Sequence, residues 1–220
     1  MLLRNKKIGD NQFGAIPESF TRHALISMVH SWTKHTDGTG STVRVVLFDY
    51  RKAFDLIDHA LLARKLLALD MPVGVSFWII DFLTDRKQRV KLGEDCLCEW
   101  RNVPAGVPQG TKLGPWLFIL MIDDISTSNT ELWKYVDDTT SAECVDKKED
   151  SRIQSDVEEL IAKSNQNNFQ LNESKCKELR ISFAKSAADF APIVINGKEI
   201  EVLSTVKLLG LNIIYRFSQG

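Results

Sequence analysis

The 220-residue sequence predicts an α+β fold in which helices flank a mixed or antiparallel β-sheet. Apolar residues recur at helical spacing in several segments, and short β-branched runs lie between them. Gly, Pro and Asn-Gly turns separate the two kinds of segment. Hydrophobic residues make up 44% and charged residues 26%, which is typical of a folded globular chain rather than a disordered one.

Helix and strand signals alternate through the first half of the chain. The predicted elements are a helix at 19–34, a buried strand at 43–48 that ends at Asp49, a helical segment after Asp49 with its apolar set at 61–69, a helix at 75–83, paired strands at 88–92 and 99–103, and an apolar helix from 115 to about 125. Pro115 is expected at the first helical position, where its missing N–H would be unpaired anyway.

The second half begins with a predicted hairpin and continues with a helix and short strands. The hairpin joins 132–135 to 139–144 around Val136-Asp137-Asp138. The segment 149–170 is amphipathic and predicts a helix. Strands are predicted at 178–183, 192–195, 199–202 and 206–213, with Asn196-Gly197 as a hairpin turn.

The charge balance excludes a strongly basic chain. Lys+Arg is 28 and Asp+Glu is 29, so nucleic-acid binding would need a local basic patch or bound metal ions. The four cysteines are too few for a disulfide-stapled secreted fold, and Cys96-x-Cys98 alone is a weak zinc signal. No apolar run is long enough to cross a membrane. We therefore expect an intracellular protein, cytoplasmic or nuclear, without a membrane partner.

Three carboxylates suggest a metal site. Asp49 follows a buried strand, and Asp137 and Asp138 lie at the tip of the predicted hairpin. Mg²⁺ prefers hard oxygen ligands, and two such ions could activate a hydroxyl and stabilise a leaving pyrophosphate. The alternative is that Asp simply favours turns and strand ends. Spacing alone favours this alternative, because the linear order does not show that Asp49 meets Asp137.

Three longer motifs carry a family resemblance. Tyr135-Val136-Asp137-Asp138 resembles the YxDD motif of reverse transcriptases, and Asp49-Tyr50-Arg51-Lys52-Ala53-Phe54-Asp55 resembles their DxxxAFD motif. The segment 106–115, GVPQGTKLGP, resembles the GVPQGSxLGP motif of non-LTR retrotransposon enzymes. Similarity continues at 83–90, 171–177 and 207–210, so it covers roughly 10–214. The chain is most similar to jockey-like or CR1-like LINE elements.

The resemblance implies a polymerase palm, an RRM-like antiparallel sheet with flanking helices, together with partial fingers and no thumb. Residues 1–42 would be lead-in and partial fingers, and 43–214 the palm with a fingers-side insertion at about 60–105. Residues 215–220 would be the truncated start of a thumb. The implied activity is RNA-directed DNA synthesis, in which dNTPs are added to a primer 3′-hydroxyl with two Mg²⁺ ions, or Mn²⁺. The implied partners are an RNA template, a DNA primer and dNTPs, and the oligomeric state is left open.

The resemblance also implies roles for individual residues. Asp49, Asp137 and Asp138 would be catalytic and hold the metal ions. Lys175 would protonate the leaving pyrophosphate or screen its charge, although a solvated lysine is nearly as good an interpretation. The implied dNTP- and template-binding residues are Tyr50 through its carbonyl, Phe54 as a steric gate against the ribose 2′-hydroxyl, Gln109, Gly110 and Tyr135. The alternatives are a core aromatic for Phe54 and an ordinary Gly/Pro turn for Gln109 and Gly110.

The sequence departs from the family pattern near its start. Ile16 stands where an arginine commonly meets the dNTP triphosphate, Ser19 replaces another basic residue, and Arg22 lies nearby. This favours the alternative of a truncated, inactive retrotransposon remnant that only folds or binds nucleic acid or a partner. The basic cluster at 86–91 is expected either to touch phosphates or to be a solvated hairpin face.

Overall fold

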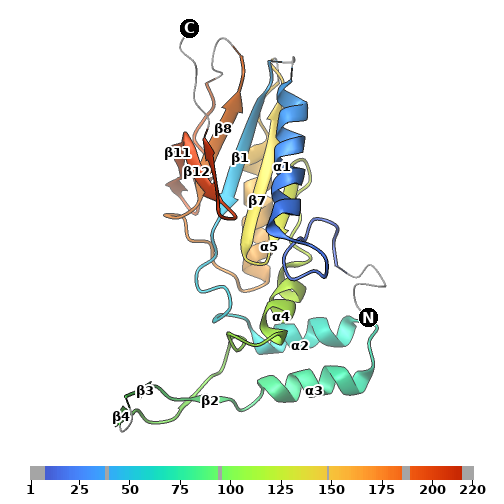
Figure 1. Ribbon diagram of the computed structural model, residues 1–220, viewed down its shortest axis with the longest axis vertical. Coiled ribbons are helices and arrows are strands. Elements are labelled where there is room, and N and C mark those ends of the chain that lie inside the picture. The colour runs from blue at the N-terminus through green and yellow to red at the C-terminus, as the bar shows by residue number, and fades with distance from the viewer. Residues whose placement is uncertain (1–7, 38–39, 94–95, 148, 185–188, 215–220) are drawn as a thin grey trace.

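Figure 1 shows the computed structural model of the chain, which describes residues 8–37, 40–93, 96–147, 149–184 and 189–214. A β-sheet with a helix on each face forms the upper part as drawn. Short helices and a long hairpin lie at its lower end. The predicted α+β class is therefore confirmed. The start of a thumb predicted at 215–220 lies outside the described residues.

The central sheet has five strands in the order β11-β8-β1-β7-β6. Its strands are β1 Thr42–Phe48, β6 Glu131–Tyr135, β7 Asp138–Val145, β8 Lys177–Ser182 and β11 Glu201–Leu203. All neighbouring pairs are antiparallel except β11 with β8, which are parallel. The sheet is therefore mixed, and the all-antiparallel arrangement predicted from the family resemblance is wrong at this edge.

Strand β1 lies in the middle of the sheet and is buried on both faces. Its register places Val43 opposite Cys144 on one side and opposite Ile181 on the other. Val46 and Phe48 belong to one hydrophobic cluster and Val43 and Val45 to another, because successive side chains of a strand point to opposite faces. This two-sided burial explains the continuous β-branched run at 43–48 and confirms the predicted strand.

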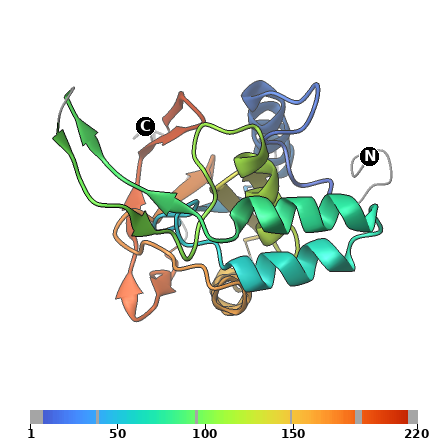
Figure 2. The same ribbon diagram turned by 90° about the horizontal axis from the view of Figure 1, so that it is seen from below.

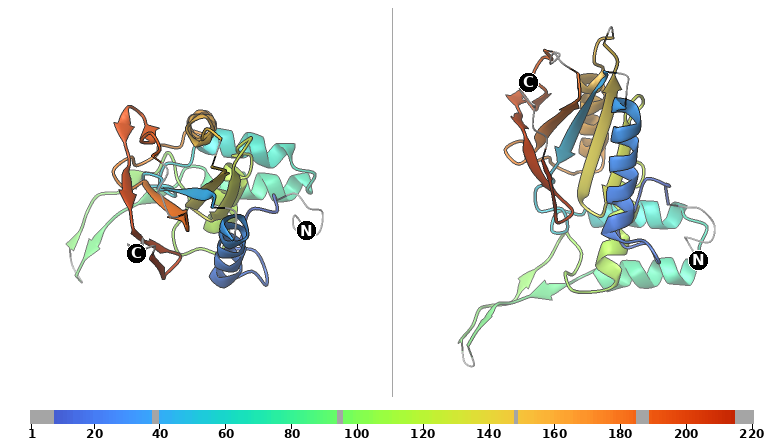
Figure 3. Two further views of the ribbon diagram at one scale, coloured as in Figure 1. Left: turned by 90° about the horizontal axis from the view of Figure 1, so that it is seen from above. Right: turned by 45° about the horizontal axis from the view of Figure 1, so that its top comes forward.

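Helices α1 Thr21–Thr36 and α5 Ile153–Gln166 cover the two faces of the sheet (Figure 3, left). Trp32 of α1 packs edge-on against Trp133 of β6, with ring centroids 6.4 Å apart. The buried face of α5 is formed by Ile153, Val157 and Leu160, as the amphipathic pattern predicted.

Three helices lie at the lower end of the sheet: α2 His59–Ala68, α3 Val73–Leu83 and α4 Leu113–Ile122. Helices α2 and α3 run side by side (Figure 2). Helix α4 is almost entirely buried and packs between the sheet and α2, which explains its uniformly apolar sequence.

A long hairpin, here called the arm, projects from this end of the molecule (Figures 1 and 2). It consists of β2 Lys87–Gln88 paired with β5 Arg101–Asn102, and β3 Lys91–Leu92 paired with β4 Cys96–Leu97. The paired strands predicted here are confirmed, although the ladder is interrupted between its two short parts.

Two smaller hairpins lie beside the sheet. One is β9 Val194–Ile195 with β10 Lys198–Glu199, joined by Asn196 and Gly197 at φ of 50° and 77°, as the Asn-Gly signal predicted. The other is β12 Thr205–Leu208 with β13 Leu211–Ile214. The single strand predicted at 206–213 is therefore wrong, because Leu209 and Gly210 adopt φ of 47° and 88° and turn the chain back.

The ends of two helices also differ from the prediction. Helix α4 begins at Leu113, so Pro115 is its third residue, where its missing N–H still has no intrahelical partner to lose. The helix predicted at 149–170 begins only at Ile153, where Glu143 of β7 accepts hydrogen bonds from the N–H groups of Arg152 and Ile153. Its far end is set by Asn168, which has a left-handed φ of 59°.

Among the described residues, no helix is both long enough and apolar enough to cross a membrane.

Candidate active site

The lower end of the sheet brings Asp49 to the β6–β7 hairpin. The last pair between β1 and β7 joins Phe48 to Thr139, so Asp49 emerges next to Asp138, the first residue of β7. Tyr135 pairs with Asp138 and closes the hairpin, which leaves Val136 and Asp137 as its turn. The antiparallel register therefore places Asp49 at the same end of the sheet as Asp137 and Asp138, from which it is distant in the sequence.

The three carboxylates differ in their exposure. Asp137 and Asp138 are exposed, whereas Asp49 is half-buried. The Oδ2 atom of Asp49 is buried without a hydrogen-bond partner among the described residues. Burying a carboxylate oxygen without a hydrogen bond is unfavourable, so this atom is suited to receive a cation.

Although their side chains are exposed, desolvation by neighbouring atoms and repulsion between carboxylates raise the pKa values of Asp137 and Asp138. For Asp137 the largest cause is desolvation; a backbone hydrogen bond opposes the shift, and the negative charge of Asp49 adds to it as the smallest of the three causes. For Asp138 desolvation is again the largest cause, followed by the charges of Asp137 and Asp49. The interactions with Asp49 show that the three groups share one electrostatic environment, which a divalent cation would relieve.

The loop before β8 is tied to the residues after β1. The N–H of Asn172 donates to the carbonyl of Asp49 at 2.7 Å, and the N–H of Arg51 donates to the carbonyl of Gln170 at 2.8 Å. Lys175 follows in the same loop, and its Nζ lies 3.6 Å from Oδ2 of Asp49. This predicted residue is therefore at the carboxylate cluster.

Beneath Asp49 lies a buried thiol. The N–H of Asp49 donates to Sγ of Cys176 at 3.5 Å. Burial raises the pKa of Cys176 to about 11, so the thiol is neutral and adds no charge to the cluster.

The donor set fits a hard divalent cation such as Mg²⁺ in its chemistry. It offers carboxylate oxygens, one of them buried and without a hydrogen bond from the described residues, and no soft ligand, since the nearby thiol stays protonated. Within the described ranges, however, no three His, Cys, Asp or Glu side chains are gathered closely enough to form a ready metal cage.

The GVPQG segment is attached to the residues that follow Asp49. The N–H of Val107 donates to the carbonyl of Phe54 at 2.9 Å, and the N–H of Gly106 donates to the carbonyl of Ile57 at 2.8 Å. His59 donates from Nε2 to the carbonyl of Gly106 at 2.7 Å. A Cβ on Gly106 would lie 2.7 Å from a backbone oxygen of Asp55, so only glycine fits there.

These attachments bring the predicted substrate-binding residues together. The Phe54 ring is half-buried and stacks on Phe118, with centroids 4.9 Å apart. Gln109 is exposed and donates from Nε2 to Asp55 Oδ1 at 3.1 Å. Gly110 has φ of 79°, a backbone conformation that favours glycine. A Cβ at this position would meet no other atom of the described residues within 4 Å, so steric crowding does not require glycine there.

A pocket of about 620 Å³ opens at the base of the arm beside this segment. Asp55 and Gln109 line it together with Arg86, Gln88 and Asn102. Its volume is in the range of small-ligand pockets, and the polar and charged side chains in its lining suit a polar ligand.

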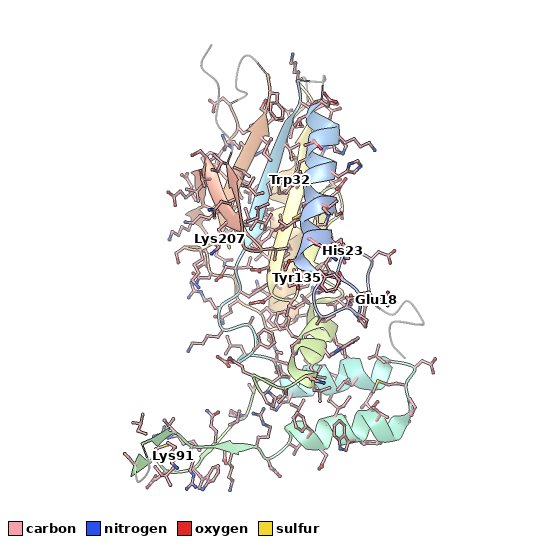
Figure 4. All side chains as sticks on the ribbon, in the orientation of Figure 1. Glu18, His23, Trp32, Lys91, Tyr135 and Lys207 are labelled. Atoms are coloured by element: carbon pink, nitrogen blue, oxygen red, sulfur yellow. The ribbon has the colours of Figure 1, made fainter. Side chains whose placement is uncertain are left out.

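The two predicted tyrosines are placed differently. Tyr50 is buried against Phe169, and desolvation raises its pKa to about 12, so only its backbone can face a ligand. The ladder bonds at this point use the carbonyl of Asp49 and the N–H of Arg51, and not the Tyr50 carbonyl. Tyr135 is half-buried at the lower end of the sheet (Figure 4).

The other residues singled out from the sequence have local contacts. Asp58 caps α2 by accepting a hydrogen bond from the N–H of Leu61 at 2.7 Å. Ile16 is half-buried in a turn closed by the N–H of Ser19, and the Arg22 guanidinium lies 4.9 Å from the centre of the Phe20 ring.

Two residues at the site were missed. Gln12 is buried beside the hairpin turn and bonds to it. Lys134 is 1% exposed, and its Nζ donates to the carbonyls of Ile122, Asp123 and Ile125 at the end of α4. The only sequence signal for Gln12 is its place in Gln12-Phe13-Gly14, and Lys134 gives none, because a lysine in a strand is usually exposed.

The fold is of the polymerase class. It is similar to a solved structure of apo telomerase from Candida tropicalis, truncated from its C-terminal domain, with a TM-score of 0.57 and 13% identity over 93% of this chain and 39% of that chain. The chain belongs to the reverse transcriptase (RNA-dependent DNA polymerase) family, whose model matches residues 1–213. The resemblance predicted from the motifs is therefore confirmed.

Curated relatives come from non-LTR retrotransposons. A Pol polyprotein of the type-1 retrotransposable element R2 from Popillia japonica is 33% identical over 87 residues, which is 40% of this chain and 12% of the relative. A probable RNA-directed DNA polymerase from transposon BS of Drosophila melanogaster is 26% identical over 237 aligned positions, which cover 100% of this chain and 25% of the relative. The chain thus spans a quarter or less of these relatives.

Proposed function

We propose that this chain is an RNA-directed DNA polymerase domain that adds dNTPs to a primer 3′-hydroxyl on an RNA template. The observation that carries the proposal is that Asp49, Asp137 and Asp138 lie at one end of the sheet, with a buried Asp49 oxygen that accepts no hydrogen bond from the described residues. Family membership supports the same reaction class, a nucleotidyl transfer.

Asp49, Asp137 and Asp138 would hold two Mg²⁺ ions, or Mn²⁺, with the Tyr50 carbonyl as a further ligand. When bound, such ions supply an activated attacking hydroxyl and charge stabilisation at the leaving pyrophosphate. The chain itself supplies position: the β1–β7 register fixes Asp49 against Asp138, and the hairpin turn orients Asp137.

Phe54 and the GVPQG segment would recognise the nucleotide. The Phe54 ring is held by stacking on Phe118, so it can stand as a fixed wall against a ribose 2′-hydroxyl. Gln109 lines the pocket at the base of the arm, where the nucleotide and the template strand would lie. Gly110 follows it in the same loop, and Tyr135 would contribute from the hairpin.

Lys175 would act at the leaving pyrophosphate. The side chain of Lys175 is 67% exposed and its Nζ lies 3.6 Å from Oδ2 of Asp49, so the ammonium can turn from this carboxylate toward a phosphate. It would donate a proton to the pyrophosphate or neutralise its charge.

The arm would contact the phosphate backbone. Its exposed basic residues are Lys87, Arg89, Lys91 and Arg101. The Arg89 guanidinium lies over the Trp100 ring, 4.6 Å from its centroid, in a cation–π contact. The arm therefore offers a positive charge beside an aromatic ring. Figure 4 shows Lys91 far out on the arm, well away from Tyr135, so the arm would extend the binding surface beyond the carboxylates. In this proposal 43–214 form the palm, with the arm in a fingers-side insertion at about 60–105, and 1–42 are a partial fingers region.

The test is primer extension with a template of poly(rA) and an oligo(dT) primer in Mg²⁺. Asp137→Asn removes a charge that the metal site needs, so we expect extension to fall below detection while the fold is kept. The control Asp81→Asn makes the same change on an exposed position of α3 and should extend like the wild type. Unchanged extension by the Asp137 variant would contradict the proposal.

A catalytically inactive domain that only binds nucleic acid or a partner is the second candidate. Ile16, in place of an arginine, favours it, because an apolar side chain cannot neutralise a triphosphate. Wild-type chain that binds the template–primer and incorporates no dNTP in Mg²⁺ or Mn²⁺ would select this candidate.

A further inference from the structure

The segment that contains Gln12 lies against the hairpin of the candidate active site. The N–H of Phe13 donates to the carbonyl of Lys134, and the N–H of Lys134 donates to the carbonyl of Asn11, both at 2.8 Å. Gln12 thereby forms an isolated parallel bridge with Lys134 at the edge of the sheet. A segment from the start of the chain is thus placed beside the turn that carries Asp137.

The Gln12 side chain connects this segment to the turn itself. Its Oε1 accepts hydrogen bonds from the N–H of Gly14 at 2.9 Å and from the N–H of Val136 at 3.2 Å. The residue is 5% exposed, so water competes little for these bonds. Its Nε2 is buried without a hydrogen-bond partner among the described residues, so the side chain is held in place through Oε1 alone.

Gly14 allows the two segments to approach each other. A Cβ added to Gly14 would lie 2.5 Å from the backbone nitrogen of Val136 and 2.6 Å from its Cγ2. No larger residue fits there without moving the turn. Gln12 and Gly14 together therefore enclose the backbone of Val136.

The turn needs such support because Val136 is in an unfavourable conformation. Its φ is 59°, in the left-handed region, which a β-branched residue rarely adopts. A strained conformation of this kind persists only where its surroundings fix it, and it is typical of functional sites. Val136 directly precedes Asp137, so its backbone sets the direction of that carboxylate.

We propose that Gln12 is a positioning residue for the active site: its side-chain carbonyl holds the strained Val136 turn and so keeps Asp137 aligned with Asp49 for divalent-cation binding. The inference rests on the proposed function, because that function supplies the divalent cation that Asp137 and Asp49 would bind. Its hydrogen bonds are within the protein and can be measured without a metal.

The first test is hydrogen exchange of backbone amides in the metal-free protein. In the wild type, the N–H of Val136 should be protected although it lies in a two-residue turn. Gln12→Met keeps the length of the side chain and removes the acceptor, so we expect exchange at Val136 and Gly14 to rise roughly tenfold or more. Exchange at Val45 and Val46, in the middle of β1, should not change.

The second test measures primer extension as a function of Mg²⁺ concentration. Gln12→Met should need several times more Mg²⁺ for half-maximal rate and should lose rate at saturating dNTP. Gln12→Glu retains an oxygen that can accept from Val136 and should restore much of the Mg²⁺ dependence. Gln166→Met, the same substitution at an exposed position of α5, is the matched control.

The outcomes separate this inference from the proposed function. An unprotected Val136 N–H in the wild type would overturn the inference without any variant, and so would an active Gln12→Met protein with wild-type Mg²⁺ dependence. Absence of extension by the wild type would instead refute the proposed function, while the exchange of Val136 would still decide whether Gln12 holds the turn.

Discussion

Nζ of Lys175 lies 3.6 Å from Oδ2 of Asp49, the same oxygen that has no hydrogen-bond partner among the described residues. The loop at 170–175 brings the two groups together through its bonds to the backbone of Asp49 and Arg51. An exposed ammonium thus balances the carboxylate while no cation is bound, and it can turn to a phosphate.

This pairing predicts that Lys175 matters for rate and little for stability. Lys175→Met should lower the rate of nucleotide addition while changing the free energy of unfolding by less than about 1 kcal/mol, because an exposed ion pair contributes little. Lys177→Met is the matched control, since Lys177 is paired with Glu201 instead. Equal rates for Lys175→Met and the wild type would mean that Lys175 is only a solvated lysine.

Phe54 is predicted to select deoxynucleotides. Phe54→Val should raise the ratio of rNTP to dNTP incorporation by roughly tenfold to a hundredfold, because the ring no longer blocks a 2′-hydroxyl. Loss of the stack on Phe118 should also cost about 1–3 kcal/mol in the free energy of unfolding. Phe54→Tyr keeps the ring and should keep the selectivity. A low rNTP ratio in Phe54→Val would leave Phe54 as a core aromatic only.

The arm is predicted to bind nucleic acid through phosphates. Changing Lys87, Arg89, Lys91 and Arg101 to Gln should weaken template–primer binding and reduce the slope of log affinity against log salt by up to about one for each phosphate that is no longer neutralised. The controls are Lys34→Gln and Lys198→Gln, which remove exposed charges away from the arm. Binding and salt dependence equal to those of the controls would show that the arm is only a solvated hairpin.

Lys134 is predicted to hold the end of α4. Lys134→Met leaves two buried carbonyls and one partly buried carbonyl without their donor, so we expect a loss of about 2–4 kcal/mol in the free energy of unfolding. Urea unfolding measures this, with Lys198→Met as the exposed control. A loss no larger than that of the control would show that the bonds contribute nothing.

Burial of Lys134 should also make the free energy of unfolding depend on pH. Desolvation lowers the pKa of Lys134 from 10.5 to about 8, so between these values the unfolded chain binds more protons than the folded one. Its contribution to stability is fully present above the unfolded pKa and is lost as pH falls through about 8. Urea unfolding between pH 7 and pH 10 should show stability rising with pH in the wild type and a flatter profile in Lys134→Met.

Local signals determined much of the fold. The β-branched run at 43–48 predicted β1, and Asn196-Gly197 predicted the β9–β10 turn, because both depend on near neighbours and burial. The turn at Leu209 was missed because leucine has no preference for positive φ. The start of α5 was missed because the group that caps the helix is Glu143, which lies on strand β7. Hydrogen bonds between distant segments leave no local pattern to read.

By itself, the sequence determined the family, the three motifs and the identity of the residues they contain, since a motif is a local order of side chains. Only the tertiary structure decided that Asp49 meets the Asp137 turn, that Lys175 pairs with Asp49, and that Gln12 supports Val136. The physical reason is that strand register and buried hydrogen bonds join residues through space, and these are fixed when the sheet and its two faces pack together.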